Sequence, residues 1–137
     1  IAAYKAVTVA SRLTQAGAQV DVLMTEAAQK FVAPLSFSAL TGRPVATDLW
    51  SLGHGQIMHV ALAREADLFL VAPATANTIA KLALGLADDP LSATALASRG
   101  PLLLAPAMET TLWHYAKGRP KEADLPNVLE IRWLDSE

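Results

Sequence analysis

The chain has 137 residues, of which 53% are hydrophobic and 18% charged, with a formal net charge of -2. No apolar run approaches the roughly 20 residues of a membrane span, and eleven basic against thirteen acidic residues leave no basic cluster for nucleic acid. The absence of cysteine excludes disulfides and thiolate metal sites within these residues. We therefore expect a single domain over 1–137 that acts on a small molecule, with the cytoplasm as the default compartment.

The first half of the chain alternates helical and strand patterns. In chain order, we expect a helix over 2–15, a strand at 20–24, a helix after Thr25 and a short helix over 36–40. Gly17 is a common helix stop, and Thr25 is a suitable N-cap. Residues 42–58 are looser, and 60–66 is ambiguous but compatible with a short helix. A doubly wound domain normally opens on a strand, so we expect a first strand before Ile1.

The second half contains two apolar runs that end alike. Residues 68–72 and 102–105 are continuously apolar, as in parallel strands covered on both faces, and each run leads into Ala-Pro-Ala. Ligands of open α/β sheets bind at the carboxyl edge, where such strands deliver their loops. The remaining helices are expected over 77–85 with Asn77 as the cap, after the Asp88-Asp89 pair, and over 127–134. The alternation predicts a three-layer α/β domain with a parallel sheet and helices on both faces.

The loop at 73–78 combines small and polar side chains. Small residues let a flat ligand approach the backbone, Asn77 offers a donor and acceptors, and Thr75 and Thr78 add hydroxyls. The helix that begins there presents free amides, which suit an anion or a carbonyl. A purely structural interpretation, in which Asn77 only caps the helix and the prolines only end strands, is equally open.

The histidines and the Asp88-Asp89 pair are the other candidates for catalytic or metal-binding residues. His59 lies among apolar residues and is either a bystander or a base or proton donor near neutral pH. His54 and His114 have no partner that spacing identifies, and no metal-ligand pattern occurs, so we expect no metal site. Asp88 and Asp89 are expected to cap a helix, because adjacent residues on a helix do not face each other. Dinucleotide, P-loop and serine-hydrolase motifs are absent.

Six short segments at consistent spacing resemble the signatures of one family. They are Ile-Ala-Ala-Tyr-Lys at 1–5, Thr-Glu-Ala-Ala-Gln-Lys-Phe-Val at 25–32, His-Val-Ala-Leu at 59–62, Pro-Ala-Thr-Ala-Asn-Thr at 73–78, Gly-Leu-Ala-Asp-Asp at 85–89, and Pro-Ala-Met at 106–108 with Trp113. Together they resemble the homo-oligomeric flavin-containing cysteine decarboxylases over residues 1 to about 116. The resemblance is strongest to the branch that acts on phosphopantothenoylcysteine in coenzyme A biosynthesis.

The resemblance implies a Rossmann-like (flavodoxin-like) fold, bound FMN, and a site between the subunits of a homotrimer or a larger trimer-based assembly. It implies decarboxylation of phosphopantothenoylcysteine to phosphopantetheine, with flavin oxidation of the cysteine side chain, loss of carbon dioxide and return of the electrons. By position, His59 matches the catalytic histidine, and Met108 and Glu109 match substrate-binding residues. The positions that match flavin contacts are Thr25, Phe31, Ala74, Thr75, Ala76, Asn77 and Ala107.

The chain departs from the family pattern in two places. Glu109 stands where the family has an Asn that holds the substrate carboxylate, and two carboxylates repel unless Glu109 is protonated or turned away. The family's cysteine-containing flap is missing, and we expect it to belong between Ala116 and Lys117. The resemblance also allows a synthetase domain to follow residue 137.

Three other functions remain open at this point. A relative that decarboxylates the carboxy-terminal cysteine of a peptide, a flavin prenyltransferase, and a non-catalytic flavin-binding regulatory subunit share much of the pattern. The Ala-Asp-Asp segment at 87–89 and Pro-Ala-Met at 106–108 favour the coenzyme A branch over the prenyltransferase.

Overall fold

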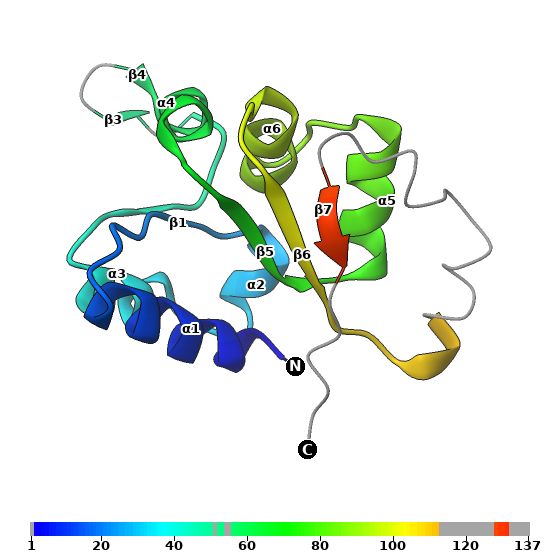
Figure 1. The fold of residues 1–137 in the computed structure, drawn as a ribbon, viewed down its shortest axis with the longest axis horizontal. Coiled ribbons are helices and arrows are strands. Elements are labelled where there is room, and N and C mark those ends of the chain that lie inside the picture. Colours follow the sequence, from blue (N-terminus) through cyan, green and yellow to red (C-terminus); the bar gives the residue numbers. More distant parts are fainter. Residues whose placement is uncertain (1, 51, 54–55, 113–127, 132–137) are drawn as a thin grey trace.

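The computed structural model describes residues 2–50, 52–53, 56–112 and 128–131 (Figure 1). Its elements are α1 (Ala3–Gln15), β1 (Val22–Leu23), α2 (Glu26–Gln29), α3 (Pro34–Thr41), β2 (Val45–Ala46), β3 (Leu52–Gly53), β4 (Gln56–Ile57), α4 (Met58–Glu65), β5 (Phe69–Ala74), α5 (Ala76–Leu84), α6 (Pro90–Ala97), β6 (Leu102–Pro106) and β7 (Val128–Ile131). Within the described part of the chain, no helix combines the length and apolar character needed to cross a bilayer.

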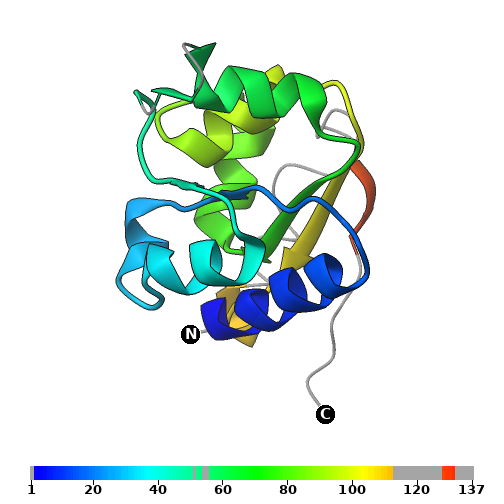
Figure 2. The same cartoon turned by 90° about the vertical axis from the view of Figure 1, so that its left-hand side faces the viewer.

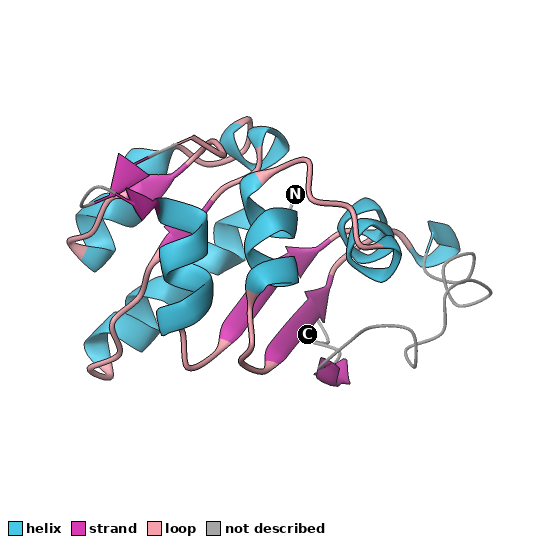
Figure 3. Ribbon diagram, turned by 90° about the horizontal axis from the view of Figure 1, so that it is seen from above, coloured by secondary structure: helices cyan, strands magenta, loops and turns pink. Residues whose placement is uncertain are grey.

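The main sheet is parallel, with strand order β5-β6-β7. Phe69 pairs with Leu102, and the two long strands point the same way when the molecule is seen from above (Figure 3). Strands β1 and β2 form a second parallel pair, whereas β3 and β4 form a short antiparallel hairpin. Parallel neighbours need a crossover connection, which α5 and α6 supply between β5 and β6. The predicted α/β class with a parallel sheet is therefore confirmed.

Helices lie on both sides of the main sheet (Figures 1 and 2). On one side, Val71, Ala74, Leu102 and Leu104 of the sheet form a buried cluster that is covered by apolar residues of α5 and α6. On the other side, Ala10 of α1, Phe37 of α3 and Met24 form a second cluster that includes the β1–β2 pair. The continuous apolar character of 69–72 and 102–105 fits strands with helices on both sides, whereas Leu68, just before β5, is half exposed.

Local signals in the sequence determine where the helices begin and end. The Thr25 hydroxyl accepts a hydrogen bond from the Ala28 amide at 3.2 Å, which caps α2 as predicted. Gly42 and Gly85 follow α3 and α5 with φ of 68°, a left-handed conformation in which glycine avoids the steric cost of a Cβ. The ambiguous segment at 60–66 is helical as far as Glu65, as part of α4.

Two expectations about secondary structure were wrong. The segment expected as a helix over 127–134 contains strand β7, whose Val128 pairs in parallel with Leu102. A short apolar run fits either element, and here the free edge of β6 accepts it as a strand. The N-cap of α5 is Thr75 rather than Asn77, because the Thr75 side chain accepts the Thr78 amide. The flap expected near 116–117 and the strand expected before Ile1 lie outside the described residues.

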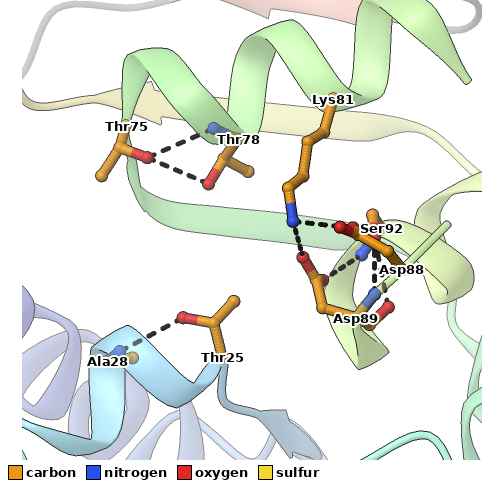
Figure 4. A network of polar contacts seen from close by, with 8 residues as sticks. All are labelled: Thr25, Ala28, Thr75, Thr78, Lys81, Asp88, Asp89 and Ser92. Atoms are coloured by element: carbon orange, nitrogen blue, oxygen red, sulfur yellow. Dashed lines mark hydrogen bonds and ion pairs between the residues drawn. The ribbon is translucent and has the colours of Figure 1, made fainter. Parts of the chain in front are cut away.

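The Asp88-Asp89 pair joins α6 to α5 (Figure 4). Asp89 forms a capping box with Ser92, which confirms the predicted capping role. Lys81 of α5 donates to Asp88 Oδ1 at 2.7 Å and to Asp89 Oδ2 at 2.8 Å. Burial acts to raise the pKa of Asp89, but the hydrogen bonds from Lys81 and Ser92 together outweigh it and hold the pKa below its ordinary value.

This lowered pKa predicts a stability change in acid. Because the folded-state pKa of Asp89 lies below the ordinary 3.8, ionised Asp89 favours folding above that pH, and its contribution is lost as the pH falls through the lowered value. Asp89→Asn keeps an N-cap acceptor but loses the charge, so we expect a loss of about 1 kcal/mol at neutral pH. Urea unfolding between neutral and acid pH should show a shallower acid decline for the variant. Identical declines for both proteins would contradict this prediction.

Candidate functional site

The two Ala-Pro-Ala loops meet at the carboxyl edge of the main sheet. Ala74 pairs with Pro106 at the ends of β5 and β6. The Ala107 amide then donates to the Ala74 carbonyl at 3.1 Å, so the pairing continues past the strand ends. The Ala74 side chain is completely buried, at 0% exposure. The backbone of Ala74 therefore anchors the first loop to the second loop.

The first loop continues directly into α5. Thr75 Oγ1 accepts the Thr78 amide at 3.2 Å and lies 3.1 Å from Thr78 Oγ1. Ala76 and Asn77 are the first two residues of the helix, and amides in this first turn have no carbonyl partner within it. Thr75 and Asn77 are exposed. This end of α5 can therefore donate hydrogen bonds to an anion or a carbonyl group.

Thr25 begins a second helix, α2. In Figure 4 it is drawn across a gap from Thr75 and Thr78 at the start of α5. Backbone amides at a helix start favour a negatively charged group. Phe31 follows α2 and is 63% exposed, an unusual position for a large aromatic side chain.

The second loop is held by its own carboxylate. Glu109 is exposed, but Oε2 accepts the Thr111 amide at 2.8 Å and Oε1 accepts the Thr111 hydroxyl at 3.2 Å. Glu109 thus caps the helical turn that begins at Thr110. Both carboxylate oxygens of Glu109 are thus engaged in this turn. Met108, the preceding residue, is half-buried.

His59 is not brought to these loops within one chain. It is the second residue of α4, and its Nδ1 lies 3.1 Å from the Leu49 carbonyl oxygen. Because a carbonyl only accepts, Nδ1 carries the proton in this contact and Nε2 is left as an acceptor. Figures 1 and 2 both show α4 at the end of the molecule away from the carboxyl ends of β5 and β6.

Lys81 was not recognised from the sequence as part of this region. It lies one turn after Asn77 and Thr78 on α5 and reaches the N-terminus of α6. The sequence does contain a pattern that predicts this ion pair. Lys81 precedes Gly85 and the Asp88-Asp89 pair follows it, so opposite charges flank a tight turn. Among the described residues no group of histidine, aspartate and glutamate could hold a metal ion.

The fold and the two joined loops define an open α/β domain of the Rossmann type whose carboxyl edge carries the exposed polar groups. The profile of the Flavoprotein family matches residues 1–127, and the chain belongs to that family.

Curated relatives are similar over most of this chain. The coenzyme A biosynthesis bifunctional protein CoaBC of Mycolicibacterium smegmatis is 49% identical over 132 residues, which cover 96% of this chain and 30% of that protein. A probable phosphopantothenoylcysteine decarboxylase of Streptococcus mutans is 46% identical over 116 residues, covering 82% of this chain and 65% of that protein. The chain thus spans about a third of the bifunctional relative and about two thirds of the shorter one.

Solved structures show the same fold. The FMN-dependent cysteine decarboxylase SpaF superimposes with a TM-score of 0.76 at 37% identity, covering 82% of this chain and 66% of that one. A mutant PPC decarboxylase complexed with pantothenoylaminoethenethiol superimposes with a TM-score of 0.68 at 30% identity, covering 82% of this chain and 64% of that one. The flavodoxin-like, Rossmann-type arrangement predicted from the sequence is therefore confirmed.

The role of Glu109 as a cap can be tested locally. Asn is a good N-cap and Ala is a poor one, so Glu109→Asn should keep the turn and Glu109→Ala should lose about 1 kcal/mol of local stability. Amide hydrogen exchange reports this directly, because the Thr111 amide donates to Glu109. We expect about fivefold faster exchange of that amide in Glu109→Ala than in Glu109→Asn. Equal exchange in both variants would mean that the side chain does not hold the turn.

Proposed function

We propose that this domain performs FMN-dependent decarboxylation of phosphopantothenoylcysteine in coenzyme A biosynthesis. The observation that carries the proposal is the junction of the two loops at the carboxyl edge, where Ala107 bonds to Ala74 beside the free start of α5. The name of the relative at 46% identity supports this activity and substrate, and that of the relative at 49% identity supports the pathway. We propose the cytoplasm as its location.

The residues at this edge fit FMN. The small side chains of Ala76 and Ala107 let a flat ring system approach the backbone, and exposed Phe31 offers an apolar face for it. The hydroxyl of Thr75 and the free amides at the start of α5 suit polar groups of the cofactor, and Thr25 at the start of α2 suits its phosphate. When bound, FMN supplies the two-electron oxidation and reduction that allow the substrate carboxylate to leave.

The side chains of this chain bind, orient and move protons. We assign proton transfer to Nε2 of His59, because the Leu49 carbonyl holds the proton on Nδ1 and thereby orients the ring. Asn77, exposed at the start of α5, can donate and accept hydrogen bonds to orient the flavin. At the second loop we propose that Met108 contacts the substrate. Glu109 adjoins it, but its carboxylate caps its own turn, so another group must receive the substrate carboxylate.

We propose that the site is completed by a second copy of the chain. His59 lies on α4, away from the joined loops of its own chain, so one subunit must present His59 to the loops of its neighbour. If each copy gives His59 to the next copy and receives it from another, the contact is heterologous, and it forms a ring when the rotation between copies closes. A homotrimer or a trimer-based assembly, as the family resemblance implies, satisfies this condition.

The other candidate functions receive less support. Two solved structures described as FMN-dependent cysteine decarboxylases are 37% and 36% identical to this chain, below the 49% and 46% of the coenzyme A relatives. No feature of the described residues favours a prenyltransferase or a purely regulatory subunit. We therefore retain the coenzyme A decarboxylation step.

The proposal predicts the behaviour of His59→Asn. The full-length protein should bind FMN, visible in its absorption spectrum, and should release carbon dioxide from phosphopantothenoylcysteine. His59→Asn should keep FMN and lose activity by about 100-fold or more, because it removes proton transfer and leaves the cofactor groups intact. A colourless wild-type protein that does not take up FMN would refute the proposal. Full activity of His59→Asn would refute the assigned role of the histidine.

Mixed assemblies test whether the site is shared between copies. Asn77→Asp places a carboxylate at the proposed flavin site, so this variant and His59→Asn should each be nearly inactive alone. When the two are co-expressed, random assembly gives some sites with an intact loop from one copy and an intact histidine from another. Such sites should number about one in four, so we expect about a quarter of wild-type activity. If each chain formed its own complete site, the mixture would stay as inactive as its parts.

A further inference from the structure

We propose that Lys81 is a positioning residue for the flavin site. Its ammonium group ties α5 to the N-terminus of α6 and so fixes the direction in which Asn77 and Thr78 project at the start of α5 (Figure 4). This inference rests on the proposed function, because it assigns to Lys81 an effect on the affinity for FMN.

The tie between Lys81 and Asp89 is stronger than an ordinary surface ion pair. The side chains of Lys81 and Asp89 are each 21% exposed, and their atoms approach to 2.8 Å. Asp88 is mostly in water, so its bond to Lys81 contributes less. Asp89 is itself held by the capping box with Ser92, which is almost completely buried. Lys81 is therefore attached to a rigid point on α6 by a charge-assisted hydrogen bond.

The opposite side of α5 does not provide the same directional control. Ile79, Leu82 and Ala83 pack against the sheet cluster, and apolar packing of this kind is non-directional. Lys81 follows Thr78 by three residues and Asn77 by four, so all three lie on one side of the helix. A roll of α5 about its axis would move Asn77 and Thr78, and the Lys81 bond, which requires a defined geometry, opposes that roll.

Lys81 is not suited to bind the cofactor phosphate itself. One ammonium group lies between two carboxylates, so the cluster carries a net negative charge and would repel an anion. Its hydrogen bonds to Asp88 and then to Asp89 raise its pKa, which keeps the group charged and engaged with its partners. An effect of Lys81 on FMN binding must therefore pass through the orientation of α5.

The test compares FMN affinity with stability in the full-length protein. Lys81→Met removes the charge but keeps the length of the side chain, and Lys81→Arg restores a charged donor. Arg43→Met is the matched control, because it removes the 2.6 Å ion pair of Arg43 with Asp21, which lies at the β1–β2 pair on the other side of the main sheet. The dissociation constant is measured by titrating FMN into flavin-stripped protein, and the free energy of unfolding by urea.

We expect Lys81→Met to weaken FMN binding by about tenfold, since small displacements of positioning groups have effects of this size or more. Lys81→Arg should recover most of that loss, and Arg43→Met should leave the dissociation constant unchanged even if it lowers stability. A purely structural role of Lys81 would lower stability without changing the affinity of the folded protein. Unchanged FMN affinity in Lys81→Met, or an equal loss in Arg43→Met, would overturn the inference.

Asp89→Asn provides a second variant if Lys81→Met does not fold. It keeps an N-cap acceptor for α6 but removes the charge that Lys81 contacts, so we expect FMN binding to weaken by about threefold. Wild-type affinity in Asp89→Asn would overturn the inference. Failure of the wild-type protein to bind FMN is a separate outcome, because it refutes the proposed function on which this inference rests.

Discussion

The parallel pairing of β5 with β6 is the constraint on which the rest of the structure depends. Parallel neighbours cannot be joined by a tight turn, so the chain must cross over through α5 and α6 before it returns as β6. Both strands then end at the same edge, and the Ala107 amide joins the second loop to the Ala74 carbonyl of the first. The start of α5, with its free amides, is delivered to that edge by the same geometry.

Near the carboxyl edge of the main sheet, Asp89, Glu109 and Lys81 hold helix ends and turns in place. Asp89 caps α6 and receives Lys81 from α5, and Glu109 caps the turn after β6. The helices are short, so their ends are a large fraction of their length and each cap carries much of the local order. The polar groups at the carboxyl edge are hydroxyls that cap helices, the Asn77 side chain and backbone amides, which suit a cofactor that carries its own reactive chemistry.

In the proposed function, the position of His59 separates cofactor binding from proton transfer within one chain. The candidate cofactor groups lie at the carboxyl edge of the sheet, whereas α4 lies at the other end of the molecule. An activity that needs both can arise only between copies, so its strength depends on assembly as well as on the fold. If the site forms only between copies, a single chain can fold before its site is complete.

The α/β class, the strands that end in Ala-Pro-Ala, the cap at Thr25 and the capping role of Asp89 could all be predicted from the sequence. Each depends on local propensity or on continuous apolar character. The sequence did not determine that 128–131 is a strand, since an apolar segment of that length fits either element until the free edge of β6 selects one. The cap at Thr75, the turn held by Glu109 and the bond from Lys81 to Asp89 depended on which hydroxyl, amide or ammonium lay within reach after folding. Motif spacing proposed His59 as a catalytic residue but not its place in the fold. That α4 lies away from the joined loops followed only from the folded structure, because it depends on how the elements pack together.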